Sequence, residues 1–373
     1  MKKVITRKLF TNIKALVNQS KTELAQVINT TLTETYFHIG RLIVEFEQEG
    51  NLRAEYAKAT LQNLSKSLIA ELGRGFSVDN LENMRKFYIN YKSLYTKHVE
   101  GNQKSETVSR KLKKSENEET LSRKLSLSPF YLSWSHYIIL LRIDEERERK
   151  FYEIEATNEM WSTRELQRNY DTALYERLVL SRDKGKVKEL SKKGHIIKKP
   201  FDIIKDPLVL EFLNLKQQES YTESDLEKAI LDQIEDFLKE LGKGFLFVEK
   251  QESIIIDGEA YKIDLVFYHR ILRCFVLIDL KLGTLKHGDI GQLQMYVNYY
   301  DAVKRTANEE KTIGIVLCKN KKENVIKYTL GENNKQIFAT KYKMFFPEKE
   351  VLTLLDDNNR ALKKIEKSTK KNK

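Results

Sequence analysis

The stretch CFVLIDLK, residues 274–281, constrains the fold more than any other part of this chain. Its apolar residues predict a buried strand, yet Asp279 and Lys281 lie two positions apart within it. Because side chains alternate along a strand, both charges project from one face and Leu280 projects from the other. Buried charges are unfavourable unless they meet one another, water or a metal ion. The fold must therefore bring further polar groups to this strand.

The elements around this strand predict an α/β fold. A helix is expected over 224–240, followed by the strand segments GFLFVEK, SIII, YKIDLVFYH and CFVLIDLK. The pair Asp257-Gly258 predicts a hairpin turn. A helix over 289–304 comes next, then a central strand (KTIGIVLCK), a helix (KENVIKYTL), a strand (KQIFATKY) and a closing helix over 348–365.

A second buried acid strengthens the case for a site. Asp264 lies within the apolar strand YKIDLVFYH, fifteen residues before Asp279. Two converging carboxylates form a site for a hard cation such as Mg²⁺, and a neighbouring lysine can stabilise charge that develops on a phosphoryl group. A buried Asp/Lys ion pair with a purely structural role is the alternative.

Helical geometry adds two candidates. Glu227 falls on the apolar side of the 224–240 helix, although Ser224 and Glu227 also have the spacing of a capping box. Gln292 falls on the inward arc of the 289–304 helix, where it could orient Lys281 or the nucleophile; a satisfied core amide is the alternative.

The N-terminal part is expected to be helical. A helix ends in Gly73-Arg74-Gly75, Ser77 offers an N-cap, and the next helix buries Leu81, Met84, Phe87 or Tyr88, and Tyr91. This order is compatible with a helix-turn-helix, and equally with three simply packed helices. In the first case, Arg85, Lys86 and Asn90 would contact nucleic acid. Ser162 and Glu165 predict a capping box.

Charge and cysteine content limit the classes of function. The net charge of +12 favours polyanionic partners, although lysine-rich composition alone can produce it. The two cysteines form no metal-binding or redox motif, and the chain has neither a membrane-length apolar run nor a signal-peptide pattern. A reduced, cytoplasmic protein without membrane contact is expected.

The ordered set Glu227, Asp264, Asp279-x-Lys281 and GQLQMY resembles the PD-(D/E)XK nuclease superfamily, and the wider sequence resembles the YhcG-like endonuclease family. The segments carrying the wider match include YKIDLVFYHR, FVLIDLKLG, YFHIGRLIVEFEQ and WSTRELQRNYDTALYERL. The resemblance implies a restriction-endonuclease-like core (αβββαβ) and a mainly α-helical, winged-helix-like N-terminal domain.

The resemblance also implies roles. Asp264, Asp279, the Leu280 carbonyl and Glu227 would bind Mg²⁺, for which Mn²⁺ can substitute. Lys281 and Gln292 would complete the catalytic set, and Tyr296 would contact nucleic acid. The expected function is a metal-dependent endonuclease acting on DNA. The alternative is a non-cleaving nucleic-acid-binding protein or a partner subunit of a restriction, defence or recombination system. A homodimer is compatible with either.

The expected domain boundaries follow from these features. Residues 1–180 would form the DNA-binding domain, with a flexible insertion at about 97–128 where ETVSRKL returns as ETLSRKL. A basic linker is expected at 181–206, the nuclease domain at 207–366 and a disordered tail at 367–373.

Overall fold

The computed structural model describes residues 2–49, 54–109, 128–180, 187–215, 221–331 and 334–344. The chain divides into two compact units, Met1–Leu166 and Gln167–Lys373. The second unit therefore begins before the expected boundary at residue 180. The expected closing helix over 348–365 and the tail lie outside the described residues.

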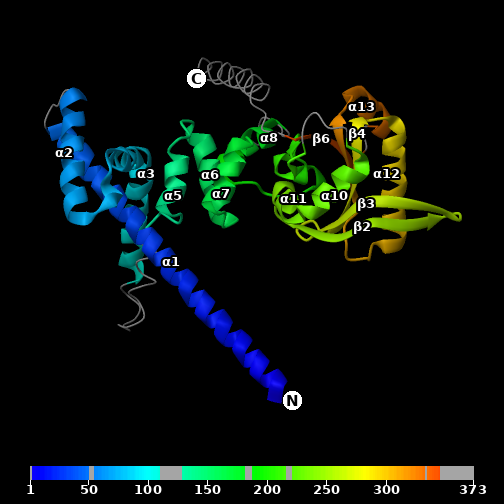
Figure 1. The fold of residues 1–373 in the computed structure, drawn as a ribbon, viewed down its shortest axis with the longest axis horizontal. Coiled ribbons are helices and arrows are strands. Elements are labelled where there is room, and N and C mark those ends of the chain that lie inside the picture. Colours follow the sequence, from blue (N-terminus) through cyan, green and yellow to red (C-terminus); the bar gives the residue numbers. More distant parts are fainter. Residues whose placement is uncertain are drawn as a thin grey trace. The chain divides into compact units, whose positions relative to one another are not determined.

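The described part of the first unit is helical, as predicted (Figure 1). No strand occurs among its described residues, so a winged-helix character remains a prediction. Its elements are α1 (Lys2–Glu49), α2 (Ala54–Leu72), the short 3₁₀ helix Arg74–Phe76, α3 (Val78–Ser109), α5 (Trp134–Leu140), α6 (Glu146–Asn158) and the start of α7 (Thr163–Asp171).

An aromatic cluster forms the core of this unit. The Phe37 ring of α1 lies 4.5 Å from the Tyr95 ring of α3, measured between centroids. The Phe87 ring lies 4.7 Å from that of Tyr137 in α5. The predicted inner face of α3 is confirmed, because Leu81, Met84, Phe87 and Tyr91 are all buried.

The predicted helix starts are confirmed by hydrogen bonds. The Asn80 backbone N–H donates to Ser77 Oγ at 3.3 Å, and the Glu165 N–H donates to Ser162 Oγ at 3.2 Å. The expected start of the insertion at residue 97 is wrong, because α3 continues to Ser109. The remainder of the insertion, 110–127, lies outside the described residues.

Helices α1 and α3 approach most closely at Gly40, where a Cβ atom would overlap the Met84 carbonyl. We expect Gly40→Ala to destabilise the first unit by about 1–3 kcal/mol, because a helix backbone cannot move aside as a flexible side chain can. Chemical denaturation of the whole chain would measure this change. Gly291→Ala in helix α12 (His287–Tyr299) is the control, since open space surrounds that position. An equal loss of stability there would contradict the steric explanation.

The second unit is built on a six-stranded mixed sheet with the order β1-β6-β5-β4-β3-β2. Strands β2, β3 and β4 pair antiparallel, whereas β4, β5, β6 and β1 pair parallel. The strands are β1 (Leu208–Val209), β2 (Phe245–Ile256), β3 (Glu259–His269), β4 (Cys274–Thr284), β5 (Ile313–Asn320) and β6 (Ile337–Lys343).

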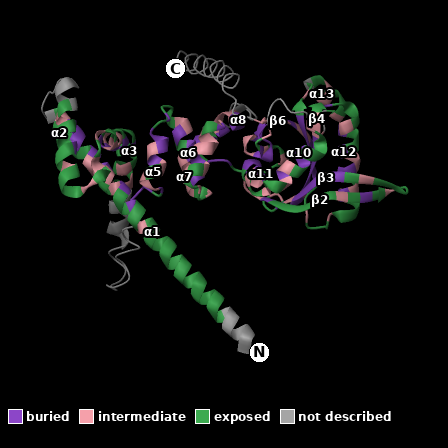
Figure 2. Cartoon of the chain, viewed as in Figure 1, coloured by how far each residue is buried: buried purple, intermediate pink, exposed green. Residues whose placement is uncertain are grey.

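Helices cover both faces of this sheet. One apolar cluster packs α10 (Glu223–Asp232) and α11 (Ile234–Leu241) against the face that includes Ile278 and Leu280. A second packs α12 (His287–Tyr299) against the opposite face, which includes Leu277 and Val316. Figure 2 shows that buried residues concentrate along the strands and the facing sides of these helices. The remaining helices are α8 (Leu174–Leu180), α9 (Val187–Lys193) and α13 (Glu323–Leu330).

Most of the predicted α/β order is confirmed, with local differences. The hairpin turn at Asp257-Gly258 has φ values of 51° and 86° and joins β2 to β3. The expected strand β5 lies inside the sheet, between β4 and β6. The helix expected over 224–240 is interrupted at Gln233, and the short strand β1 was not predicted.

The expected linker at 181–206 is wrong for its described part, 187–206. Leu190, Ile203 and Ile204 are buried, and the Lys205 ammonium donates to the Glu240 carbonyl at 2.5 Å. The lysine content indicated a solvated segment, but the apolar residues between the lysines pack into the second unit.

None of the described helices is both long and apolar enough to cross a membrane.

A buried ionic cluster ties residues 167–180 to the same unit. Arg177 Nη1 lies 2.6 Å from Glu240 Oε1, and both side chains have no exposed area. Arg168 lies 3.1 Å from the other Glu240 oxygen and 2.7 Å from Glu211. Burial alone would raise the pKa of Glu240, but Arg177, Lys205 and Arg168 lower it to about 2.

Candidate active site

The candidate site lies where the pairing of β3 and β4 ends. The two strands are paired from His269 opposite Cys274 to Leu265 opposite Ile278. The next positions are Asp264 and Asp279, and no rung joins them. Instead, Asp264 Oδ2 accepts the Leu280 backbone N–H at 2.8 Å. The Asp264 carboxylate therefore accepts the hydrogen bond that a β3 backbone carbonyl would accept in a continuing sheet. The two acids lie at the point where β3 and β4 separate.

The Leu280 backbone fits a second role at this point. In an extended strand, the N–H and C=O of one residue point toward the same neighbouring strand. Since the Leu280 N–H points toward Asp264, its carbonyl is directed to that side as well. The carbonyl oxygen and the two acids thus border one region, while the Leu280 side chain packs into the core on the opposite face.

Asp279 and Lys281 lie on one face, as the alternation predicted. Lys281 Nζ is 2.9 Å from Asp279 Oδ2. The Asp279 side chain is nearly fully buried, with 3% of its area exposed, whereas that of Lys281 is 19% exposed. Among the described residues, no donor makes a well-directed hydrogen bond to Asp279 Oδ2, despite the close ammonium. This oxygen retains capacity for a cation or a water molecule.

The electrostatics of the acids favour a bound positive charge. Burial raises the pKa of Asp279 to about 6, against the opposing effect of Lys281 and with a further increase from Asp264. Burial also raises the pKa of Asp264; the Leu280 N–H and Lys281 lower it, and Glu227 raises it. A cation would relieve the repulsion between these carboxylates, since an opposite charge favours their ionised form.

Lys281 remains cationic in this setting. Its burial acts to lower its pKa, but the ion pair with Asp279 outweighs burial and the pKa is raised. At neutral pH the residue is therefore an ammonium group, able to donate to an anionic substrate. Asp279 holds it in place.

Glu227 does not take part in the capping box at the start of α10, although its spacing from Ser224 allowed it. The N-cap of α10 is Thr222, whose hydroxyl accepts from the Asp225 N–H at 3.1 Å. The capping alternative for Ser224 and Glu227 is therefore wrong. Glu227 is only 6% exposed and accepts from Gln251 Nε2 at 2.7 Å. Because its charge affects the pKa of Asp264, it belongs to the same acidic group.

Two polar neighbours of the site were not predicted. Glu223 Oε2 lies 3.8 Å from Lys281 Nζ, and its other oxygen accepts the Leu282 N–H at 3.2 Å. Gln251 of β2 contacts Glu227. The four-residue spacing between Glu223 and Glu227 places both acids on one side of α10 and could have revealed the first. Nothing in the sequence around Gln251 indicated its position.

The prediction that Gln292 faces inward is wrong, because the residue is exposed. The buried arc of α12 consists of Ile290, Leu293, Tyr296 and Val297. Gln292 borders this arc, and its amide donates to the Tyr296 hydroxyl at 2.6 Å. The expected arc also included Val303, which lies in a wider π-helical turn after α12 and is 61% exposed.

Direct contact of Tyr296 with nucleic acid is contradicted by its complete burial. Burial raises the pKa of its hydroxyl; Gln292 lowers it, and Asp279 and Asp264 raise it further. The hydroxyl is thus within electrostatic reach of both acids. Tyr296 connects the exposed Gln292 amide to the site from inside the protein.

The three α3 residues expected to bind nucleic acid differ in solvent exposure and in their existing partners. Arg85 is engaged with Glu47 of α1 at 2.7 Å. Lys86 and Asn90 are exposed. The structure therefore leaves two of the three side chains open to solvent on the predicted outer face.

The donor set fits a magnesium-type ion. Within the described ranges, no three acidic, histidine or cysteine side chains form a preassembled metal-binding group. Mg²⁺ does not require one, because it binds through one or two carboxylates and keeps several waters. Asp264, Asp279 with its open oxygen, and the Leu280 carbonyl meet that requirement, and Glu227 can act through water.

Comparisons with known proteins identify the family of this chain. Residues 201–357 match the YhcG PDDEXK nuclease domain, and residues 12–177 match the DUF1016 N-terminal domain. The chain is 38% identical over 348 residues to an Escherichia coli (strain K12) protein described as "Putative nuclease YhcG", covering 90% of both chains.

Solved structures give a more limited likeness. A repair endonuclease from Pyrococcus abyssi aligns with a TM-score of 0.24 at 16% identity, over 34% of this chain and 49% of that one. An EndoMS–dsDNA complex aligns with a TM-score of 0.25 at 16% identity, over 34% and 48%. The sequence matches are much more extensive, and by them the chain belongs to the family that joins a DUF1016 N-terminal domain to a YhcG PDDEXK nuclease domain.

Proposed function

We propose that this protein is a metal-dependent nuclease that hydrolyses phosphodiester bonds of DNA. The observation that carries the proposal is the meeting of Asp264, Asp279 and Lys281 at the end of the β3–β4 ladder. An ion pair with a structural role alone would not account for the further acids beside it, Asp264 and the buried Glu227 of α10.

The acids and one carbonyl would hold Mg²⁺ or Mn²⁺. PDDEXK nucleases use divalent metal ions. Asp264, Asp279 and the Leu280 carbonyl are the direct ligands in this proposal, with Glu227 acting through water. The bound ion would supply Lewis-acid stabilisation of the phosphoryl oxygens and a more acidic water.

Lys281 would act on the substrate. Its ammonium can position the attacking water and stabilise the negative charge that develops on the phosphoryl group. The Lys281 ammonium lies 2.9 Å from Asp279 and 3.8 Å from Glu223. They fix its position, so Glu223 is a positioning residue. Gln292, anchored by Tyr296, would contact the phosphate or Lys281 from the rim.

The first unit would grip the substrate. The exposed Lys86 and Asn90 of α3 are the proposed contacts, supported by the net charge of +12. The test of the proposed function is cleavage of labelled single-stranded, duplex and branched DNA, and of matching RNA, with Mg²⁺ or Mn²⁺. DNA cleavage that requires the ion is expected. Metal-dependent cleavage of RNA alone would overturn the proposed substrate.

Cleavage at low Mg²⁺ concentration should fall about tenfold per pH unit below pH 6. Asp279, whose pKa is raised to about 6, must lose its proton before it can bind the ion. At saturating Mg²⁺ the midpoint should shift to lower pH, because the ion competes with the proton. Initial cleavage rates measured against pH at two Mg²⁺ concentrations test this prediction. A pH midpoint that does not change with Mg²⁺ concentration would contradict it.

The same shift predicts how Asp279 affects stability without metal. Its pKa in the folded protein lies above the ordinary value of 3.8. The favourable contribution is therefore fully present below pH 3.8 and is lost as the pH rises to about 6. At neutral pH the ionised residue disfavours the folded state, which is the pattern of a residue retained for binding rather than for folding.

A further inference from the structure

Helix α1 carries an apolar face that the first unit does not cover. Its inner face, including Phe37, Gly40 and Val44, packs into the core. At 100° per residue, a second set lies on the opposite side. This outer stripe consists of Phe10, Ile13, Val17, Leu24, Ile28, Leu32, Leu42 and Phe46, each between 45% and 66% exposed.

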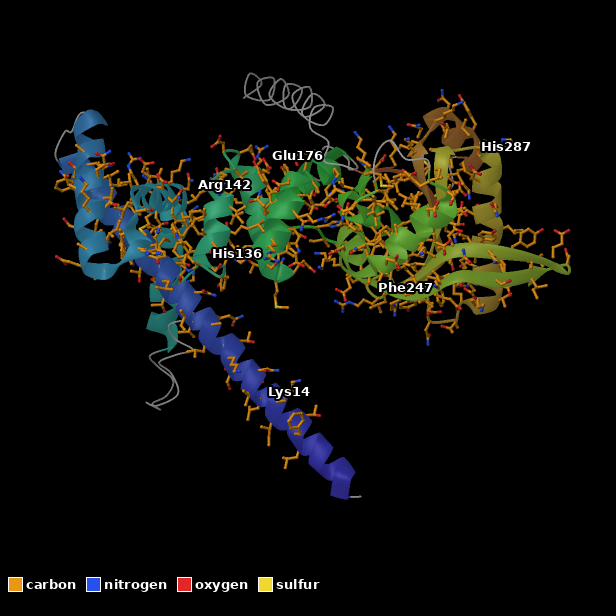
Figure 3. All side chains as sticks on the ribbon, viewed as in Figure 1. Lys14, His136, Arg142, Glu176, Phe247 and His287 are labelled. Atoms are coloured by element: carbon orange, nitrogen blue, oxygen red, sulfur yellow. The ribbon has the colours of Figure 1, made fainter. Side chains whose placement is uncertain are left out.

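Among the described residues of the first unit, no other element covers the N-terminal half of α1. Every described residue from Leu9 to Gln26 is exposed. Figure 1 shows this half extending beyond the other helices of the first unit, and Figure 3 shows its side chains, with Lys14 labelled, projecting into open space. A helix gains most of its stability from packing an apolar face, so a partner is required here.

The spacing of the outer stripe is that of a helix-pairing seam. Its residues recur in steps that combine three and four, with Ser20 and Thr35 at intermediate positions. Ile39 lies at the edge of the stripe and is partly buried against the core of the first unit. From Phe10 to Phe46 the stripe extends about 54 Å along the helix. The mean step of about 3.6 residues keeps the stripe on one side of a straight helix, where it can pack along another helix.

Charge indicates which helix fits. Residues 2–25 contain six basic residues and one acidic residue, whereas residues 26–49 contain one basic and four acidic residues. The two halves of α1 therefore carry formal net charges of +5 and −3. Arg85 of α3 pairs with Glu47, so the acidic half offers a net charge of −2 to a partner (−3 + 1). A second copy lying antiparallel would place the basic half of each helix beside the acidic half of the other, with their macrodipoles opposed.

We propose that α1 pairs antiparallel with α1 of a second copy of this chain through the outer stripe. A two-fold axis near Ile28, the midpoint of the stripe, makes the interface self-complementary. The inference is independent of the proposed nuclease activity. It assigns α1 as a dimerisation arm and explains why one helix carries apolar residues on two opposite faces.

Sedimentation or light scattering of the full chain tests the pairing. At tens of micromolar, the wild-type protein should have twice the 43.9 kDa chain mass. Ile13→Glu combined with Leu24→Glu should give a monomer. Asn12→Glu combined with Gln26→Glu adds the same charge at exposed positions on the far side of α1 and should leave the dimer intact. A monomeric wild type, or a dimeric stripe variant, would overturn the proposal.

Introduced cysteines test the orientation. The two native cysteines are buried and unpaired, so they do not compete. In an antiparallel pair, Ile28→Cys should cross-link between copies on mild oxidation, because the two midpoints meet, while Phe10→Cys should not. Cross-linking at both positions would indicate a parallel pair and overturn the orientation. Binding of a monomeric chain to anionic vesicles would overturn the choice of partner.

Discussion

Lys281→Ala should lower metal-dependent cleavage by at least about 100-fold. The reason is geometric as well as electrostatic. The ammonium is held 2.9 Å from Asp279 and is about one-fifth exposed, so it reaches the solvent side of the acids where a phosphate would lie. Loss of this donor removes charge stabilisation that water cannot reproduce. Plasmid cleavage under identical Mg²⁺ concentrations measures the effect.

Lys311→Ala is the matched control for Lys281. Lys311 is an exposed lysine just before the start of β5, whereas Lys281 pairs with Cys318 near the far end of that strand. Both variants remove one positive charge from the same unit. Equal rates for the two variants would assign the activity to a contaminant or to another site. Thermal unfolding would establish that Lys281→Ala remains folded.

Asp279→Asn should abolish both cleavage and the stabilisation of the protein by divalent ions. The wild-type protein should unfold at a higher temperature with Mg²⁺ or Mn²⁺, because a ligand of the folded state stabilises it. The variant should show no such shift, since an amide is a poor substitute for the carboxylate at the open oxygen. Without metal, its stability near neutral pH should be unchanged or higher, because the buried charge is gone.

Two substitutions of Asp264 can distinguish an effect on folding stability from an effect on metal-ion binding. Asp264→Asn keeps an oxygen that can accept the Leu280 N–H, whereas Asp264→Ala leaves that N–H without its acceptor. Only the alanine variant should lose about 1–3 kcal/mol of stability, while both should lose cleavage. Ion-dependent stabilisation that persists in Asp264→Asn and Asp279→Asn would contradict the assignment of the metal ligands.

The sequence predicted those features that depend on local period or on a resemblance. The alternation in β4 placed Asp279 and Lys281 on one face, and the structure confirms it. The pairing of Asp257 with Gly258 predicted the hairpin, because both residues adopt positive φ with little strain. The inner face of α3 followed from helical spacing alone.

Other features depended on contacts that no local pattern contains. From the sequence, the Leu280 N–H would be expected to donate to a carbonyl of a neighbouring strand. It donates to the Asp264 carboxylate instead, because β3 and β4 separate at this point. Thr222 caps α10, and not Ser224 two residues later. Both side chains carry a hydroxyl that can cap a helix, so the sequence alone did not distinguish them. Because Thr222 is the cap, Glu227 is not held in a capping box. The phase of α12 was predicted about one residue off, which left Gln292 exposed rather than inward.

The ionic cluster around Glu240 has a consequence for where the second unit can be separated from the first. The family match for the nuclease domain begins at residue 201, yet Arg168 and Arg177 lie before it and neutralise a carboxylate with no exposed area. A fragment that started at residue 201 would retain Glu240 without these two guanidinium groups. A piece that keeps both partners of Glu240 therefore includes α7 and α8, so the compact unit that starts at Gln167 is longer than the segment defined by the family match.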